Sequence, residues 1–156
     1  MADLDILLSI DTVLPGLKSN GMPQLYQTLA RESAPVTRLP DAYIYDKLME
    51  QERRDSSGVG GGVAIAHLRL PRLEKPFTIL ATLHHHLDLS CVDNKPVDLM
   101  LLLLSPQQDV AGHLYRLSRF SRLLRQDDIC KKLRTAEDSD ALQKLFPQIT
   151  PGMRAA

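Results

Sequence analysis

The 156-residue sequence has no net charge, because 19 Lys and Arg residues are balanced by 19 Asp and Glu residues. A balanced chain lacks the overall positive field that holds a polyanionic backbone, so we expect no nucleic-acid partner. Cysteine is also scarce. Cys91 and Cys130 are too few and too far apart for a disulfide scaffold, and their spacing suggests no zinc site. We therefore expect reduced thiols.

Long hydrophobic stretches are missing as well. The strongest apolar run, Leu99 to Leu104, is far shorter than the roughly 20 residues that a membrane-spanning helix needs. The N-terminal segment lacks the basic start of a secretory signal, and Asp3, Asp5 and Asp11 interrupt its apolar residues. We expect a cytoplasmic protein with no membrane insertion. The length and the 44% of hydrophobic residues predict a single domain over residues 1–156.

The spacing of apolar residues predicts the order β-α-α-β-β-β-α-α-α. The expected strands are Thr12–Ser19, Val63–His67, Phe77–Leu83 and Val97–Leu104. The expected helices are Met22 to about Glu32, Asp41–Arg54, a long helix that begins at Pro106 after a Ser105 cap, Asp128–Arg134 and Asp138–Phe146. This order predicts an α/β (α+β) fold, a three-layer α/β/α sandwich with a central mixed β-sheet.

A glycine-rich segment stands out, with four of the eight glycines inside the five residues 58–62. Such a run predicts a loop without regular structure, and the strand that follows it ends on His67. The segment is no dinucleotide fingerprint, because Val63 stands where the third glycine would fall, and no GK[ST] follows to make a P-loop. Taken alone, these residues favour a tight connection and an ordinary strand-end histidine over a functional site.

Other polar residues admit two interpretations. Consecutive strand residues point to opposite faces, so His84, His85 and His86 do not predict a metal site. On the long helix, His113 by itself favours a half-buried histidine in an apolar stripe formed by Val110, Leu114, Leu117, Ser121 and Leu124. The same helix carries arginine at every third position, which predicts a solvated basic strip that could also meet an acidic partner: Arg116, Arg119, Arg122 and Arg125.

Three separated segments nevertheless resemble one known family. LMEQERRDSSGVGGGVAIAH is similar to the active-site motif of enzyme IIA domains of the phosphotransferase system, of the fructose, mannitol and nitrogen-regulatory type. VDNKPVDLMLLLLSP resembles the third strand of the family's active region, and HLYRLSRFSRLLRQDDICKKLR its following helices. The likeness runs from about Leu4 to Phe146. The likeness is greatest for the nitrogen-regulatory branch, as indicated by the segments LKSN, VDNKPVDL and ICKKLR.

The resemblance implies a histidine phosphocarrier of the transferase class without a cofactor or metal. His67 would accept a phosphoryl group from an HPr-like carrier of the nitrogen-related system (NPr), and His113 would support the transfer. Neutral imidazole is a suitable nucleophile near pH 7, and glycine-rich backbone approaches an anion closely. The expected phosphate-binding residues are Ser57, Gly60, Gly61, Gly62 and Arg54. The implied targets are sensor kinases or potassium-transport components. The sequence does not predict whether the protein forms a homodimer or whether the phosphorylated or the free form is the signal.

Three positions depart from the family pattern. Gln51 stands where an arginine is expected, Ala66 replaces a proline before His67, and Leu68 replaces a glycine after it. Arg54, or less readily Arg53, is predicted to replace the missing cation, because residues three apart on a helix are neighbours. The alternative is a solvated basic helix end. These departures also motivate a second function, a phosphotransfer-impaired EIIA-like interaction module, whereas a nucleotide or metal enzyme lacks any complete motif.

Overall fold

The structure, a computed structural model, describes residues 10–88, 93, 95–136, 138 and 140. Its strands are β1 (Thr12–Leu17), β2 (Gly58–Gly60), β3 (Val63–Leu70), β4 (Phe77–Leu87) and β5 (Val97–Pro106). Its helices are α2 (Met22–Thr37), α3 (Asp41–Arg54), α4 (Val110–Leu123) and α5 (Asp127–Thr135).

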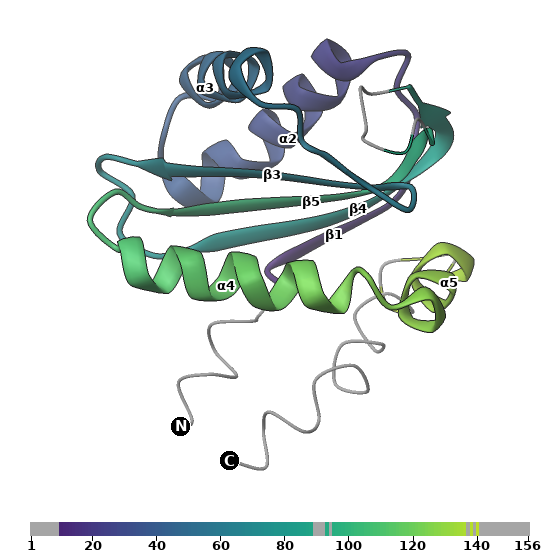
Figure 1. The fold of residues 1–156 in the computed structure, drawn as a ribbon. Helices are drawn as coiled ribbons and strands as arrows, with labels where there is room; N and C mark the ends of the chain where they lie inside the picture. Colours follow the sequence, from purple (N-terminus) through teal and green to yellow (C-terminus); the bar gives the residue numbers. More distant parts are fainter. Residues whose placement is uncertain (1–9, 89–92, 94, 137, 139, 141–156) are drawn as a thin grey trace.

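The strands form one mixed sheet in the order β1-β4-β5-β3-β2. The β1–β4 and β3–β5 pairs are parallel, and the β4–β5 and β2–β3 pairs are antiparallel. Helices α2 and α3 cover one face of this sheet, and α4 and α5 lie on the other (Figure 1). The predicted three-layer α/β/α sandwich with a mixed sheet is therefore confirmed.

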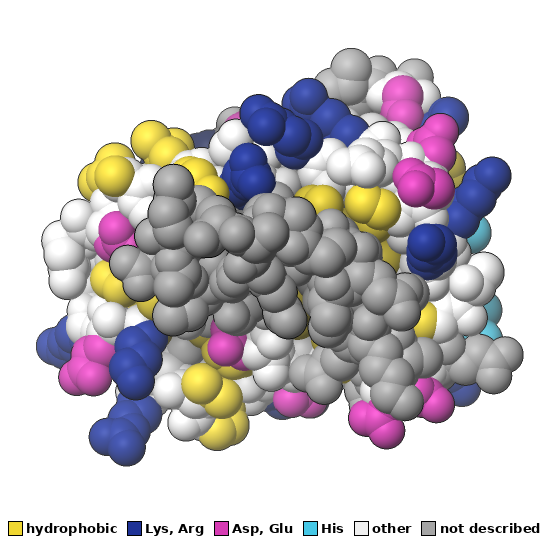
Figure 2. Space-filling model, turned by 90° about the horizontal axis from the view of Figure 1, so that it is seen from below, with side chains coloured by type: hydrophobic (Ala, Val, Ile, Leu, Met, Phe, Trp, Pro, Cys, Tyr) yellow, Lys and Arg dark blue, Asp and Glu magenta, His cyan; other side chains and the backbone are white. Residues whose placement is uncertain are grey.

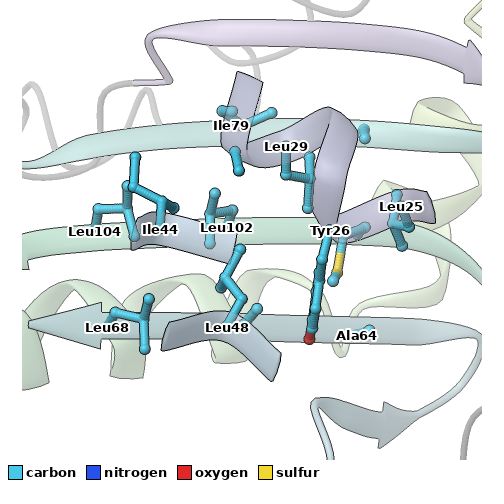
Figure 3. Close-up of a cluster of buried hydrophobic side chains, with 14 of the residues drawn as sticks. Leu25, Tyr26, Leu29, Ile44, Leu48, Ala64, Leu68, Ile79, Leu102 and Leu104 are labelled. Atoms are coloured by element: carbon cyan, nitrogen blue, oxygen red, sulfur yellow. The ribbon is translucent and has the colours of Figure 1, made fainter. Parts of the chain in front are cut away.

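Side chains of β3 and β5 alternate between two hydrophobic cores, as the pleat of a strand requires. Ala64, Leu68 and Leu102 pack under α2 and α3, together with Leu25, Leu29, Ile44 and Leu48 of those helices (Figure 3). Val63 and Ile65 of β3 face the other core, with Phe120, Leu123 and Leu133 of α4 and α5. By the same alternation His67 and Arg69 lie on the α4 side of the sheet.

Helix α2 continues to Thr37, past the expected end at Glu32, with Pro35 inside its last turn. A proline there removes only one backbone donor, and the buried hydroxyls of Ser33 and Thr37 donate to the carbonyls of Leu29 and Ser33 at 2.7 and 2.8 Å. Arg38 then ends the helix in left-handed backbone with φ of 61°. Burial of the polar side chains thus overrides the local stop signal.

The expectation that residues 58–62 form only a loop is wrong in part. Gly58 to Gly60 make the short edge strand β2, which pairs with the start of β3. The turn itself consists of three consecutive glycines at φ of 98°, 66° and 81°, a left-handed run that other residues rarely adopt. The glycines therefore build a tight hairpin.

The predicted start of the long helix at Pro106 is also wrong. Pro106 is the last residue of β5, paired with Leu70, and α4 begins at Val110 after Asp109, whose carboxylate accepts the Gly112 N–H at 3.1 Å. The strand continues because its backbone pairing with β3 extends to that residue. Four residues of Pro106–Asp109 therefore belong to the strand end and turn, and His113 lies in the first turn of the helix.

This later start accompanies a different buried face of α4. His113, Arg116, Phe120 and Leu123 face the sheet, whereas the expected core residues Val110 and Leu114 are 47% and 59% exposed. Arg116 is only 1% exposed, so its assignment to a solvated strip was wrong. Figure 2 looks onto the side of α4 and α5, and the visible side chains include Lys and Arg as well as Asp and Glu.

Some expectations fall outside the described residues. The predicted helix Asp138–Phe146 does so apart from Asp138 and Asp140, and so does Cys91. Cys130 is a buried free thiol whose pKa is raised by burial. Within the part of the chain that the structure describes, no helix is both long and apolar enough to cross a membrane.

Candidate functional site

Polar side chains gather where the parallel strands β3 and β5 end. The row of side chains that faces α4 is aliphatic along both strands and then changes to His67 and Arg69 on β3 and to Ser105 on β5. The first turn of α4 adds His113 to the same place, because α4 begins just after β5 and returns over this edge. One end of the sheet thus combines residues from three elements.

His67 and His113 form a direct pair. His67 Nδ1 lies 3.0 Å from His113 Nε2, and the ring centroids are 5.1 Å apart with 43° between the planes. His113 is 4% exposed, and its other nitrogen, Nδ1, lies 2.7 Å from Ser105 Oγ. His67 is half-buried, and its Nε2 has no hydrogen-bond partner among the described residues. Nε2 is therefore the ring nitrogen available to a reacting group.

Both histidines are held in their neutral form near pH 7. Burial, with the nearby His67 and the positive charge of Arg116, lowers the pKa of His113 to about 4. Burial also lowers the pKa of His67, and the carboxylate of Asp55 partly offsets that effect. A neutral imidazole keeps a lone pair and is a competent nucleophile.

A small pocket beside His67 is bordered by the end of α3 and the start of β2, including Gln51, Asp55 and Ser57. Glu52 fixes this corner: its carboxylate accepts the Tyr26 hydroxyl at 2.6 Å and the Ser57 backbone N–H at 3.2 Å. Burial and the neighbouring Glu52 accordingly raise the pKa of Tyr26. The Ser57 N–H is therefore already bonded inside the protein.

The structure does not bring the expected glycine cradle to His67. Gly62 precedes β3 and His67 lies five residues further on, a separation of about 16 Å at roughly 3.3 Å per residue. The Gly61 N–H donates to Asp93 at 2.8 Å, and the Gly61 carbonyl accepts from Arg134 at 2.6 Å. A carboxylate of the protein thus occupies the anion position at Gly61.

Arg54 also lies outside the pocket. Its guanidinium is 3.7 Å from the Glu50 carboxylate and 3.4 Å from the Gln51 side-chain oxygen, and its side chain is 68% exposed. Of the other departures from the family pattern, Ala66 and Leu68 belong to the core under α2 and α3, on the opposite face of β3 from His67. Gln51 and Ala66 both border the pocket, and of the two only Gln51 has a polar side chain.

Sequence reasoning missed three residues of this region: Asp55, Ser105 and Arg116. Asp55 directly precedes the SSGVGGG segment, and this position was the available signal. Ser105 was interpreted as a helix cap and Arg116 as a surface charge, because the helix was expected to begin four residues too early. Had the β5 pairing been known, both would have been placed under α4.

The described residues contain no group of three or more His, Cys, Asp and Glu that could hold a metal ion. His84, His85 and His86 are exposed at the end of β4, where His86 Nε2 lies 3.5 Å from the Asp98 carboxylate. A larger hollow of about 490 Å³ lies elsewhere, bordered by Arg38, Arg72 and Lys75 but also by Asp11 and Glu74. We place the candidate chemistry at the histidine pair, because the two rings are in contact there.

Asp55→Asn is expected to lower the pKa of His67 further, because the carboxylate that favours the imidazolium form is removed. Titration of the His67 ring protons by NMR measures this shift. Asp46→Asn, an exposed carboxylate on α3 that does not border the pocket, is the control. An unchanged or raised pKa of His67 in Asp55→Asn would contradict the electrostatic role of Asp55.

Comparison with known proteins gives a consistent family. Residues 24–149 match the family model described as "Phosphoenolpyruvate-dependent sugar phosphotransferase system, EIIA 2". The chain is 41% identical over 140 residues to a nitrogen regulatory protein of Bradyrhizobium diazoefficiens, covering 90% of this chain and 92% of the relative. It is 29% identical over 144 residues to a nitrogen regulatory protein of Pseudomonas aeruginosa, covering 92% of each.

The fold agrees with solved structures. The crystal structure of nitrogen regulatory protein IIA-Ntr from Neisseria meningitidis superposes with a TM-score of 0.80 at 24% identity, covering 86% of this chain and 91% of that one. Mannitol IIA from Escherichia coli superposes at 0.71 with 11% identity, covering 85% and 94%. The family model and the curated relatives show that the chain belongs to the EIIA type 2 family of the phosphotransferase system and is a phosphocarrier and regulatory protein of its nitrogen-related branch.

Proposed function

We propose that His67 accepts a phosphoryl group at Nε2 from an HPr-like phosphocarrier (NPr) in the cytoplasm. The Nε2 lone pair attacks phosphorus, the bond from phosphorus to the carrier's histidine breaks, and the carrier's ring keeps the electron pair. The observation that carries the proposal is the His67–His113 contact of 3.0 Å, which leaves Nε2 without a partner among the described residues. The phosphorylation state would then regulate partners such as sensor kinases or potassium-transport components.

His113 has a supporting role in this proposal. Both of its ring nitrogens have neighbours, Nε2 at His67 and Nδ1 at Ser105. We therefore propose that His113 orients the His67 ring and does not donate a hydrogen bond directly to the phosphoryl group. A fixed neighbour lowers the barrier because the ring need not be ordered during the transfer.

Incubation of the protein with phosphoenolpyruvate, the upstream carriers and radiolabelled phosphate tests the proposal. Acid-labile, base-stable label at one residue per chain is the expected result, because a phosphoramidate is hydrolysed in acid. Acid-stable label would indicate a phosphoester and contradict it. The same reaction without the HPr-like carrier is the control.

One observation favours the second function, an EIIA-like interaction module with impaired phosphotransfer. The pocket beside His67 presents the carboxylate of Asp55 and the neutral amide of Gln51, and Arg54 is turned toward Glu50. A phosphoryl group adds about 1.5–2 negative charges and is stabilised by cationic donors, so this corner is unfavourable to it. The module would bind its partners without any change in covalent state.

Gln51→Arg is expected to speed labelling by roughly tenfold, because a guanidinium at this pocket position would pair with the incoming phosphoryl group. Arg54→Ala is its matched control, and we expect a rate within about twofold of wild type, since exposed ion pairs contribute little. Initial rates of label transfer measure both. A strong loss in Arg54→Ala would instead support Arg54 as the replacement cation.

A further inference from the structure

A buried chain of polar contacts continues behind the histidine pair. Ser105 Oγ, at the end of β5 and fully buried, lies 2.7 Å from His113 Nδ1 and 2.8 Å from Arg116 Nη2. The same Nη2 lies 3.0 Å from the Asp109 carboxylate. The chain therefore runs from the His67 ring through His113 and Ser105 to Arg116.

Burial of the Arg116 side chain at this place is energetically unfavourable. Its Nε and Nη1 atoms are buried with no hydrogen-bond partner among the described residues. Burying a guanidinium with incomplete partners opposes folding, so packing alone does not account for an arginine under α4. Arg116 does contact Ser105 and Asp109, so it acts directly on the Ser105 hydroxyl.

The chemistry of Arg116 favours one direction for the hydrogen bonds that link Arg116, Ser105, His113 and His67. A guanidinium has donors only, so Nη2 donates to Ser105 Oγ. Of the two neighbours of that hydroxyl, only His113 Nδ1 accepts its hydrogen. When the hydroxyl donates to His113 Nδ1, neutral His113 carries its proton on Nε2 and donates it to His67 Nδ1, and this tautomer satisfies both contacts. Neutral His67 in turn carries its proton on Nε2, the nitrogen without a partner among the described residues.

This arrangement opposes reaction at Nε2, which needs a lone pair there. In the reactive arrangement, the proton between the rings is bonded to His67 Nδ1. His67 Nε2 has released its proton to water, and His113 Nδ1 has taken a proton from water. The total number of protons is unchanged. The Ser105 hydroxyl must then accept the hydrogen on His113 Nδ1 and turn its own hydrogen away from the ring, which leaves that hydrogen without an acceptor among the described residues.

We propose that Ser105, held in place by the buried Arg116, is a positioning residue that sets the tautomer of the His67–His113 pair and thereby slows phosphorylation of His67. The inference rests on the proposed phosphorylation of His67. Loss of the Ser105 hydroxyl would release His113 Nδ1, and the reactive tautomer would become more populated.

Nitrogen-15 NMR of histidine-labelled protein tests the tautomers directly, because the pattern of ring couplings identifies the protonated nitrogen. In the wild type we expect the proton on Nε2 of both His67 and His113. In Ser105→Ala we expect the proton of His67 to shift from Nε2 toward Nδ1. We also expect labelling from the phosphorylated carrier to be roughly two- to tenfold faster, because one net hydrogen bond changes an equilibrium by about that factor. Ser105→Thr keeps the hydroxyl and should restore wild-type behaviour.

Ser33→Ala removes another fully buried hydroxyl, in α2 and away from the pair, and controls for general loosening of the core. A wild-type His67 protonated on Nδ1 would overturn the inference without any variant, even if Ser105→Ala fails to fold. Equal labelling rates in wild type and folded Ser105→Ala would also overturn it. Absence of label from the wild type and every variant would instead refute the proposed function.

Discussion

His67→Ala is expected to abolish acid-labile labelling from the carrier, a loss of at least about a hundredfold. The variant removes the one ring nitrogen of the histidine pair that has no hydrogen-bond partner among the described residues. Thermal unfolding should change little, because His67 lies at the rim of the pocket and contributes to neither hydrophobic core.

The matched control for this variant is His85→Ala, which removes an exposed histidine from β4, away from the pair. It should take up label at the wild-type rate. If label enters His67→Ala at that rate as well, the phosphoryl group goes to another residue, and the assignment of His67 is wrong.

His113→Ala should still take up label on His67, but roughly a hundredfold more slowly in both directions, the usual effect of losing one prepositioned partner. The contact of His113 with His67 Nδ1 orients the acceptor ring, and alanine removes that contact. Rapid-quench measurement of labelling and of return transfer to the carrier gives both rates.

His113→Gln, which retains one polar group, separates orientation from packing. We expect an intermediate rate, because an amide could contact His67 without reproducing the ring geometry. Unchanged rates in His113→Ala, with the protein folded by circular dichroism, would return His113 to a purely structural role under the sheet.

The sequence was informative where chemistry and periodicity agreed locally. Helix α3 has the expected bounds, Asp41–Arg54, because its apolar residues recur at helical spacing and proline precedes them. The strands β3, β4 and β5 begin at the expected residues, Val63, Phe77 and Val97. Their ends lie further on, because continued pairing with a neighbouring strand sets the length of a strand and is not written in the strand's own residues.

The candidate site was only partly predictable for the same reason. His67 and His113 were singled out by resemblance to a family, and their separation by 46 residues gives no indication that the rings touch. The glycines were expected to bind phosphate because glycine-rich backbone approaches an anion closely, yet extended backbone separates Gly62 from His67 at about 3.3 Å per residue.

By itself, the sequence determined the family, the layered α/β/α architecture and the two histidines of interest, because motifs, periodicity and composition are properties of neighbouring residues. Only the tertiary structure decided what surrounds those histidines. It buried Arg116 under α4, placed Ser105 beside His113, turned Arg54 outward and left Asp55 at the pocket. The positions of Ser105 and Arg116 depend on where β5 stops and α4 begins, which strand pairing across the sheet fixes and local sequence does not.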